Sequence, residues 1–207
     1  MRAPQRPLLA TIVVLFAGGG LAGISTQAPT FPVPDQSAPI IDELVATQDF
    51  QRRVDEYVTV HRMLERSLPP LRPTRNMAEI HQNMRALATR MQTARANAKQ
   101  GDIITPDVGR MFKRRIATCL SPEAWASVLA ELDEDLEGKA VAPVMLRVNM
   151  TWPEGVQYGF LPPQLLFALP PLPPELQYRV IGRSLVLWDH HADVIVDFLP
   201  VAFFSTS

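Results

Sequence analysis

The chain has 207 residues, of which 47% are hydrophobic, and its formal net charge at pH 7 is −1. This composition is typical of a globular protein and lacks the basic excess of a nucleic-acid-binding protein. Its single cysteine, Cys119, excludes an intramolecular disulfide, so packing must stabilise the fold. We expect Cys119 to be a small apolar group on a helix.

Residues 1–28 have the pattern of a secretory signal peptide. Two arginines precede the uncharged stretch 8–24, and small residues follow it. Cleavage after Ala28 satisfies the small-residue rule, and cleavage after Ser25 is the alternative. The other interpretation is an uncleaved anchor, because a stretch of this length is at the lower limit of what spans a bilayer. We expect a cleaved signal and therefore a periplasmic or secreted protein, which contacts a membrane only if this segment is retained.

A flexible proline-rich linker is expected over 29–40, and the region 41–138 has helical periodicity. One apolar stripe, with steps of three and four residues, ends before Pro69 and consists of Phe50, Val54, Tyr57, His61, Leu64 and Leu68. A second stripe, which ends before Gly101, consists of Met77, Ile80, Met84, Leu87, Met91, Ala94 and Ala98. Since the connection between them is short, we expect an antiparallel helix hairpin.

Two shorter helices are expected to follow, over 106–119 and 122–137. A hydroxyl residue followed by proline precedes each of them, and this pair is typical of a helix N-terminus. The capping residues are Thr105 and Ser121. The region 41–138 is therefore predicted to hold four helices.

Residues 139–207 are expected to form a proline-rich segment and a β-hairpin module, in one compact domain with the helices. The pattern predicts a strand over 144–152. The segment 161–176 has too many prolines for a helix or a sheet interior, so it is predicted to be extended, polyproline-II-like or turning. A hairpin follows, with arms 178–188 and 193–199, a loop of about four residues and a bulge at Gly182. The predicted fold class is α+β, with the four-helix region packed on a C-terminal antiparallel β element.

The C-terminal quarter of the chain is similar to the β-hairpin module of exported RcnB-like proteins of nickel and cobalt homeostasis, and of related periplasmic proteins. The residues that carry this resemblance are Leu172, Pro173, Pro174, Tyr178, Gly182, Leu185, Leu187, Asp189, Ile195 and Asp197. The resemblance implies an exported protein with a β-hairpin module. The helical region 41–138 departs from that family.

Polar residues gather at the predicted hairpin apex, and they are the candidate metal ligands. They are Asp189, His190, His191 and Asp193. Imidazole combined with carboxylate suits nickel, cobalt or zinc, although a solvated turn also explains these residues. The methionines Met77, Met84 and Met91 offer thioethers for Cu(I), with core filling as the alternative.

An apolar set in the proline-rich segment is the candidate partner surface, and the expected partner is another envelope protein. It comprises Leu161, Leu165, Leu166, Phe167 and Leu169. The sequence has no catalytic motif of a familiar kind, so we expect a non-catalytic periplasmic binding or interaction module without a cofactor. The alternative is a periplasmic metal-binding protein that uses the hairpin apex. An enzyme is a further alternative, because Tyr57, His61 and Glu65 share one helix face and could do acid–base work.

Overall fold

The computed structural model describes residues 38–70, 72–137, 145–156 and 161–203. The chain divides into two units, 1–35 and 36–207, and all described residues belong to the second. The predicted signal peptide and most of the linker therefore lie outside the described residues. Within the described part of the chain, no helix has the length and apolarity needed to cross a membrane.

Helix α1 (Ala38–Arg66) begins inside the predicted linker and carries the first predicted stripe. All six stripe residues are buried or half-buried, and the Phe50 and His61 side chains are fully buried. The helix ends just before the Pro69-Pro70 pair, where the amides of Ser67 and Leu68 donate to carbonyls of the last turn. The prediction of this helix and of its buried face is confirmed.

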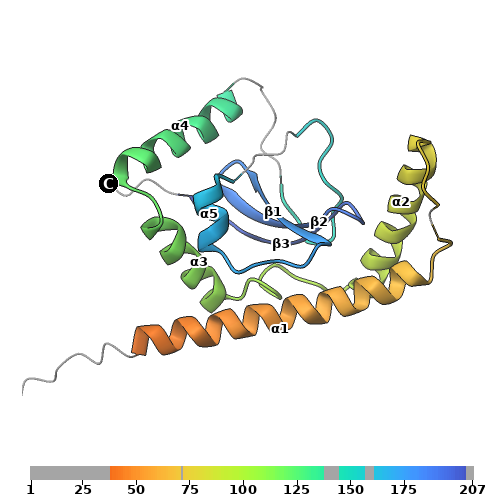
Figure 1. The fold of residues 1–207 in the computed structure, drawn as a ribbon, viewed down its shortest axis with the longest axis horizontal. Helices are drawn as coiled ribbons and strands as arrows, with labels where there is room; N and C mark the ends of the chain where they lie inside the picture. The colour runs from red at the N-terminus through yellow and green to blue at the C-terminus, as the bar shows by residue number, and fades with distance from the viewer. Residues whose placement is uncertain (1–37, 71, 138–144, 157–160, 204–207) are drawn as a thin grey trace, which may run out of the picture. The chain divides into compact units, whose positions relative to one another are not determined.

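Helix α2 (Met77–Ala94) contacts α1 near its own C-terminal end, where Arg90 bonds the Ser67 hydroxyl and Arg95 lies over the Tyr57 ring, so the predicted antiparallel hairpin does not form along the length of the helices (Figure 1). Its buried residues, however, all lie in its C-terminal half. They are Leu87, Ala88 and Met91. Figure 1 shows α2 meeting α1 at one end and extending away from it at the other. The second stripe is therefore a packing seam over only part of its length, and the helix ends before Ala98.

Helices α3 (Pro106–Thr118) and α4 (Pro122–Glu137) follow with the predicted caps. The Thr105 hydroxyl accepts from the amide of Val108, and the Ser121 hydroxyl accepts from the amide of Ala124. Helix α3 also approaches the sheet closely at Gly109, where a Cβ atom would lie 2.9 Å from Leu199 Cδ1. Glycine at this position therefore allows the helix to pack against the last strand.

The proline-rich segment contains a short helix, α5 (Pro163–Ala168), so the prediction that its prolines exclude a helix was wrong. Pro162 precedes this helix and Pro163 is its first residue, where a missing N–H removes no helical hydrogen bond. The prolines that follow come after the helix has ended. Their position in the segment, and not their number, decides where a helix can form.

Three antiparallel strands in the order β1-β2-β3 form the sheet: β1 (Leu176–Ile181), β2 (Ser184–Asp189) and β3 (Val194–Leu199). The predicted first hairpin arm is thus two strands, and Gly182 is part of the turn between them and not a bulge. Its φ of +57° is the left-handed conformation that tight hairpin turns require. The irregularity in pairing lies instead between β2 and β3, where Leu187 pairs with Asp197 and Trp188 pairs with Ile195, so that Val196 of β3 is the extra residue.

The predicted strand over 144–152 was also wrong. Residue 144 lies outside the described residues, and the rest of the segment forms one isolated bridge, between Thr151 and Val194. Asn149 has a φ of +67°, which interrupts an extended chain. The segment still lies beside β3, because the Ile195 amide donates to the Met150 carbonyl at 2.8 Å.

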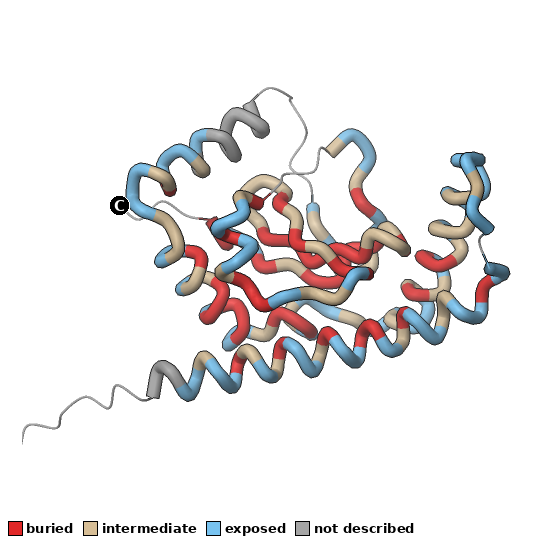
Figure 2. Tube along the Cα trace, in the orientation of Figure 1, coloured by how far each residue is buried: buried red, intermediate tan, exposed pale blue. Residues whose placement is uncertain are grey.

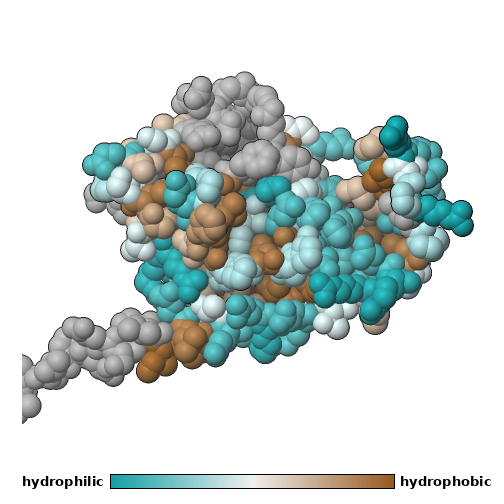
Figure 3. Space-filling model, viewed as in Figure 1, coloured by the Kyte–Doolittle hydropathy of each residue, from teal (hydrophilic) through white to brown (hydrophobic). Residues whose placement is uncertain are grey.

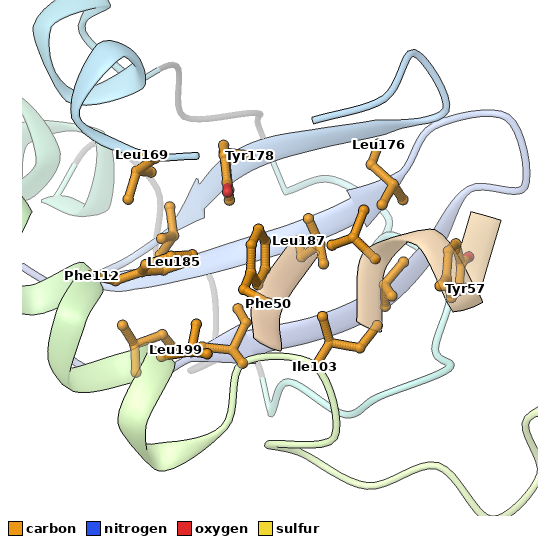
Figure 4. Packing of buried hydrophobic residues seen from close by; sticks show 14 of the residues in the cluster. Phe50, Tyr57, Ile103, Phe112, Leu169, Leu176, Tyr178, Leu185, Leu187 and Leu199 are labelled. Carbon is orange, nitrogen blue, oxygen red and sulfur yellow. The ribbon is translucent and has the colours of Figure 1, made fainter. Parts of the chain in front are cut away.

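One face of the sheet packs on the helices and holds most of the core (Figure 4). There the Phe50 ring of α1 meets the Phe112 ring of α3 edge-on, with centroids 5.1 Å apart. A smaller cluster on the sheet consists of Trp152, Val186, Trp188 and Ile195. Figure 2 shows buried residues concentrated in the strands and on the inner sides of α1 and α3. The predicted α+β class, with helices first and strands last, is confirmed.

Candidate functional site

The last residue of β2, Asp189, joins the sheet to helix α1. Its Oδ2 atom accepts hydrogen bonds from the Tyr57 hydroxyl and from Nδ1 of His61, each at 2.6 Å. Its Oδ1 atom accepts from the backbone amides of His191 and Ala192 at 3.0 and 2.9 Å. The carboxylate is fully buried and both of its oxygens are occupied. Tyr57 and His61 reach it together because residues four apart share one helix face.

The charges in this contact favour an ionised Asp189. Burial alone would raise the pKa of Asp189, but the His61 hydrogen bond and charge, with the Tyr57 hydroxyl, hold it below the usual value. Burial alone would lower the pKa of His61, yet its bond to Asp189 and the nearby charges of Glu65 and Glu175 raise it. Burial and the Asp189 charge raise the pKa of Tyr57, so its hydroxyl stays a donor.

The Asp189 bond also sets the orientation of the His61 ring. An ionised carboxylate only accepts, so Nδ1 of His61 carries the hydrogen. In the neutral ring, Nε2 is then a bare acceptor. This Nε2 atom is buried and has no hydrogen-bond partner among the described residues. A buried polar atom without a hydrogen bond is rare, and the carboxylate oxygen of Glu65 at 3.6 Å is beyond hydrogen-bond distance.

Two further side chains surround that nitrogen and form with it the His61–Glu65–His191 cluster. One ligand atom from each residue lies within 4.8 Å of the others. His61 Nε2 is 3.6 Å from Glu65 Oε2, and His191 Nδ1 is 3.4 Å from Glu65 Oε1. Nitrogen and oxygen ligands about 2.0–2.2 Å from a tetrahedral zinc ion stand about 3.3–3.6 Å apart. The two printed distances, each to a different oxygen of Glu65, match this spacing, and the whole set lies within 4.8 Å.

The cluster differs from the site predicted at the hairpin apex. Among the four predicted ligands, His191 belongs to it, and Asp189 lies behind it as the partner of His61. His190 points elsewhere and donates from Nε2 to the Pro174 carbonyl at 2.7 Å. Asp193 accepts from the indole of Trp188 at 3.2 Å. The apex residues thus do not converge on one point. The other two members of the cluster, His61 and Glu65, come from helix α1.

The sequence contained one signal for these helix residues, which is the four-residue spacing of Tyr57, His61 and Glu65. The structure brings all three to the turn between β2 and β3. The spacing suggested acid–base chemistry, and nothing in it pointed to His191. The contact between His61 and Asp189 spans 128 residues of sequence, so only the tertiary fold shows it.

The apolar residues predicted as a partner surface do not form one surface. Three of them, Leu161, Leu165 and Leu169, are buried in the core. The other two lie on α5, where Leu166 is 44% and Phe167 is 90% exposed. Figure 3 shows an apolar patch at the position of α5. The segment therefore serves mainly to cover the sheet, with a small apolar projection.

The sulfur-containing residues lie in separate environments. Met91 is fully buried in the main core, whereas Met77 on the same helix is 58% exposed. The Cys119 thiol is half-buried at the end of α3 and donates to the Ile116 carbonyl, and burial raises its pKa. None of these sulfur atoms belongs to the His61–Glu65–His191 cluster.

No family model, no curated protein and no solved structure matches this chain. The resemblance to RcnB-like proteins therefore stays a prediction. The function has to be inferred from the geometry of the cluster itself.

Proposed function

We propose that this protein binds a divalent transition-metal ion, such as zinc, nickel or cobalt, through His61, Glu65 and His191. The observation that carries the proposal is the buried Nε2 atom of His61, which makes no hydrogen bond among the described residues and lies beside a carboxylate and a second imidazole. The metal-binding alternative from the sequence is thus retained with a different set of ligands, drawn from α1 and the β2–β3 turn.

Asp189 supports the proposal because it is the hydrogen-bond partner of one proposed ligand, His61. Metal-binding histidines usually donate their other ring N–H to a carboxylate or carbonyl, which fixes the ring and makes the ligand nitrogen more basic. His61 has this arrangement, with its Nδ1 2.6 Å from Asp189. The four hydrogen bonds that Asp189 accepts hold it in place, so the His61 ring is oriented before any ion arrives.

The donor set indicates the class of metal. Two imidazole nitrogens and one carboxylate suit zinc, nickel and cobalt, whereas Cu(I) prefers sulfur and magnesium or calcium prefer oxygen alone. The negative charge of Glu65 offsets part of the charge of a divalent ion.

Isothermal titration of the purified full chain with zinc, nickel and cobalt tests the proposal. We expect one ion per chain, and a loss of affinity of at least about tenfold in His191→Ala and Glu65→Gln. Both side chains are partly exposed, so neither change should unfold the protein. His190→Ala is the matched control, since it removes an imidazole that packs against the His191 ring, 4.5 Å between centroids, but supplies no atom to the cluster. If His191→Ala binds as the wild type does, the proposed site is wrong.

We also propose that this site operates in the periplasm or outside the cell. The support is the signal-like pattern of residues 1–28, which precedes the described part of the chain. Fusion of these residues to alkaline phosphatase, an enzyme active only after export, tests this. Activity should require the segment, and activity of a fusion without it would contradict the assignment.

A second candidate function is the protein-interaction role expected from the sequence. The specific observation in its favour is Phe167, a large apolar side chain with 90% exposure. Crosslinking of the protein in whole cells, compared with its Phe167→Asp variant, tests this role. A crosslinked partner that the variant loses would support it, and identical crosslinks in both would exclude α5 as the contact.

A further inference from the structure

We infer that Glu65 binds the ion through both of its oxygens, so that the three side chains of the His61–Glu65–His191 cluster supply four donor atoms and close the site. This inference rests on the proposed metal-binding function, and it assigns the ion a structural role. Zinc sites that are closed by protein donors are usually structural, whereas catalytic sites keep one position open.

The positions of the two Glu65 oxygens carry the inference. Oε2 is the oxygen beside His61, 3.6 Å from its Nε2, and Oε1 is the oxygen beside His191, 3.4 Å from its Nδ1. Each nitrogen thus neighbours a different oxygen of the same carboxylate. An ion that bonds both nitrogens lies between these two contacts and therefore faces both oxygens. A carboxylate that bound through one oxygen would instead have both nitrogens beside that oxygen.

The charges around the cluster balance a divalent ion without an anion from outside. Glu65 contributes one negative charge as a ligand. Asp189 contributes a second, because it is buried and ionised behind His61 and the neutral groups that donate to it leave its charge in place. Glu175, the remaining carboxylate that acts on His61, is offset by the guanidinium of Arg62. Two negative charges therefore match the two positive charges of zinc, nickel or cobalt.

The closed site joins two parts of the fold that are distant in sequence. His61 and Glu65 lie one turn apart on α1, whereas His191 lies in the turn between β2 and β3. The buried bonds of Asp189 to Tyr57 and His61 already link these parts. An ion adds a second link on the solvent side of that contact, because Glu65 and His191 are partly exposed. The ion therefore fastens the turn to the helix, and this role needs no exchangeable ligand.

X-ray absorption fine structure at the cobalt edge tests the chelation, with the full-length protein loaded with one equivalent of Co(II). A chelating carboxylate holds its carbon closer to the metal than a carboxylate that binds through one oxygen. We expect two imidazole nitrogens, two oxygens and the short cobalt–carbon distance. Sodium azide, which binds an open position on cobalt, should leave the visible absorption of the same sample unchanged at constant ionic strength. His190→Ala should behave as the wild type does, since His190 supplies no atom to the cluster.

The outcomes separate this inference from the function on which it rests. If cobalt binds in a His191-dependent manner but the cobalt–carbon distance is long, Glu65 binds through one oxygen and the inference is wrong. A saturable change of the visible bands with azide would show an open position and would also overturn it. If cobalt does not bind, or binds equally well to His191→Ala, the proposed function fails and the inference fails with it.

Discussion

Asp189→Asn removes the carboxylate that joins β2 to α1 while keeping the size of the side chain. The amide retains one acceptor oxygen, so one pair of donors, either the two backbone amides or Tyr57 and His61, meets an NH₂ group. Hydrogen bonds to a charged group contribute about 1.5–3 kcal/mol each, and breaking a buried ionic contact costs about 3–5 kcal/mol. We expect the variant to lose about 3–5 kcal/mol of unfolding free energy in metal-free buffer.

Asp197 offers a matched control within the same sheet. It is also fully buried, and its carboxylate accepts from the backbone amides of Gly101, Ile103 and Ile104 at 3.0, 2.9 and 2.8 Å. It holds the loop before α3 and has no contact with the cluster. Asp197→Asn should therefore destabilise the fold to a similar degree without changing the metal site.

Two measurements distinguish the variants. Urea unfolding in the presence of a chelator gives the change in unfolding free energy, and zinc titration gives the change in affinity. Because Asp189 orients the His61 ring, its variant should bind zinc about 10- to 100-fold more weakly, whereas Asp197→Asn should bind as the wild type does. A urea midpoint of Asp189→Asn equal to that of the wild type would refute the structural argument. Equal loss of zinc affinity in both variants would refute the role of Asp189 as the orienting group.

Three further predictions concern the neighbouring contacts. Burial alone would raise the pKa of Glu175, but the hydrogen bond from Arg62 holds it below its usual value of about 4.3. The pair therefore stabilises the fold at pH values above the usual pKa, and this stabilisation is lost as pH falls through the lower pKa of the folded protein. Arg62→Met should thus lower the free energy of unfolding more at pH 7 than at pH 4, as measured by urea unfolding at both values; a larger loss at pH 4 would be inconsistent with this. Trp188→Ala should lower the free energy of unfolding by about 3–5 kcal/mol, whereas His191→Ala without metal should lower it by under about 0.5 kcal/mol. Equal urea midpoints for the two variants would show that the sheet is not part of the core. Zinc at about 100 times its Kd should raise the unfolding free energy by about 2.7 kcal/mol in the wild type, and a similar gain in His191→Ala would contradict the ligand set.

The helical part of the fold was predictable because its signals are local. The stripe from Phe50 to Leu68 follows from helix periodicity, and the caps at Thr105 and Ser121 depend on residues only three positions away. Each of these features is set by neighbours in sequence. The structure accordingly confirms the helices with only small changes at their ends.

The errors arose where backbone conformation or distant packing decides the outcome. The sequence around Gly182 is compatible with a bulge within one strand or with a turn between two strands. Only the pairing of β1 with β2 shows that it is a turn. Asn149 interrupts an alternating pattern through a left-handed conformation that its residue type permits but does not require. For α5, a short apolar run with flanking prolines is compatible with either an extended segment or one helical turn.

The candidate site was only partly predictable for the same reason. Asp189 and His191 were selected from the hairpin apex, and His61 and Glu65 from the helix face, but nothing local connected the two sets. Their meeting depends on how α1 packs across the end of the sheet. The assignment of His190 and Asp193 as ligands failed to anticipate that other partners, Pro174 and Trp188, would take their polar atoms.

Anomalous diffraction from crystals of the zinc-loaded protein tests the central claim most directly, because it locates the ion without reference to any variant. We predict one anomalous peak per chain within bonding distance of His61 Nε2, the Glu65 carboxylate and His191 Nδ1, with Asp189 still bonded to Nδ1 of His61. A peak held instead by His190 or Asp193 at the turn, or no peak at the His61–Glu65–His191 cluster at saturating zinc, would contradict it.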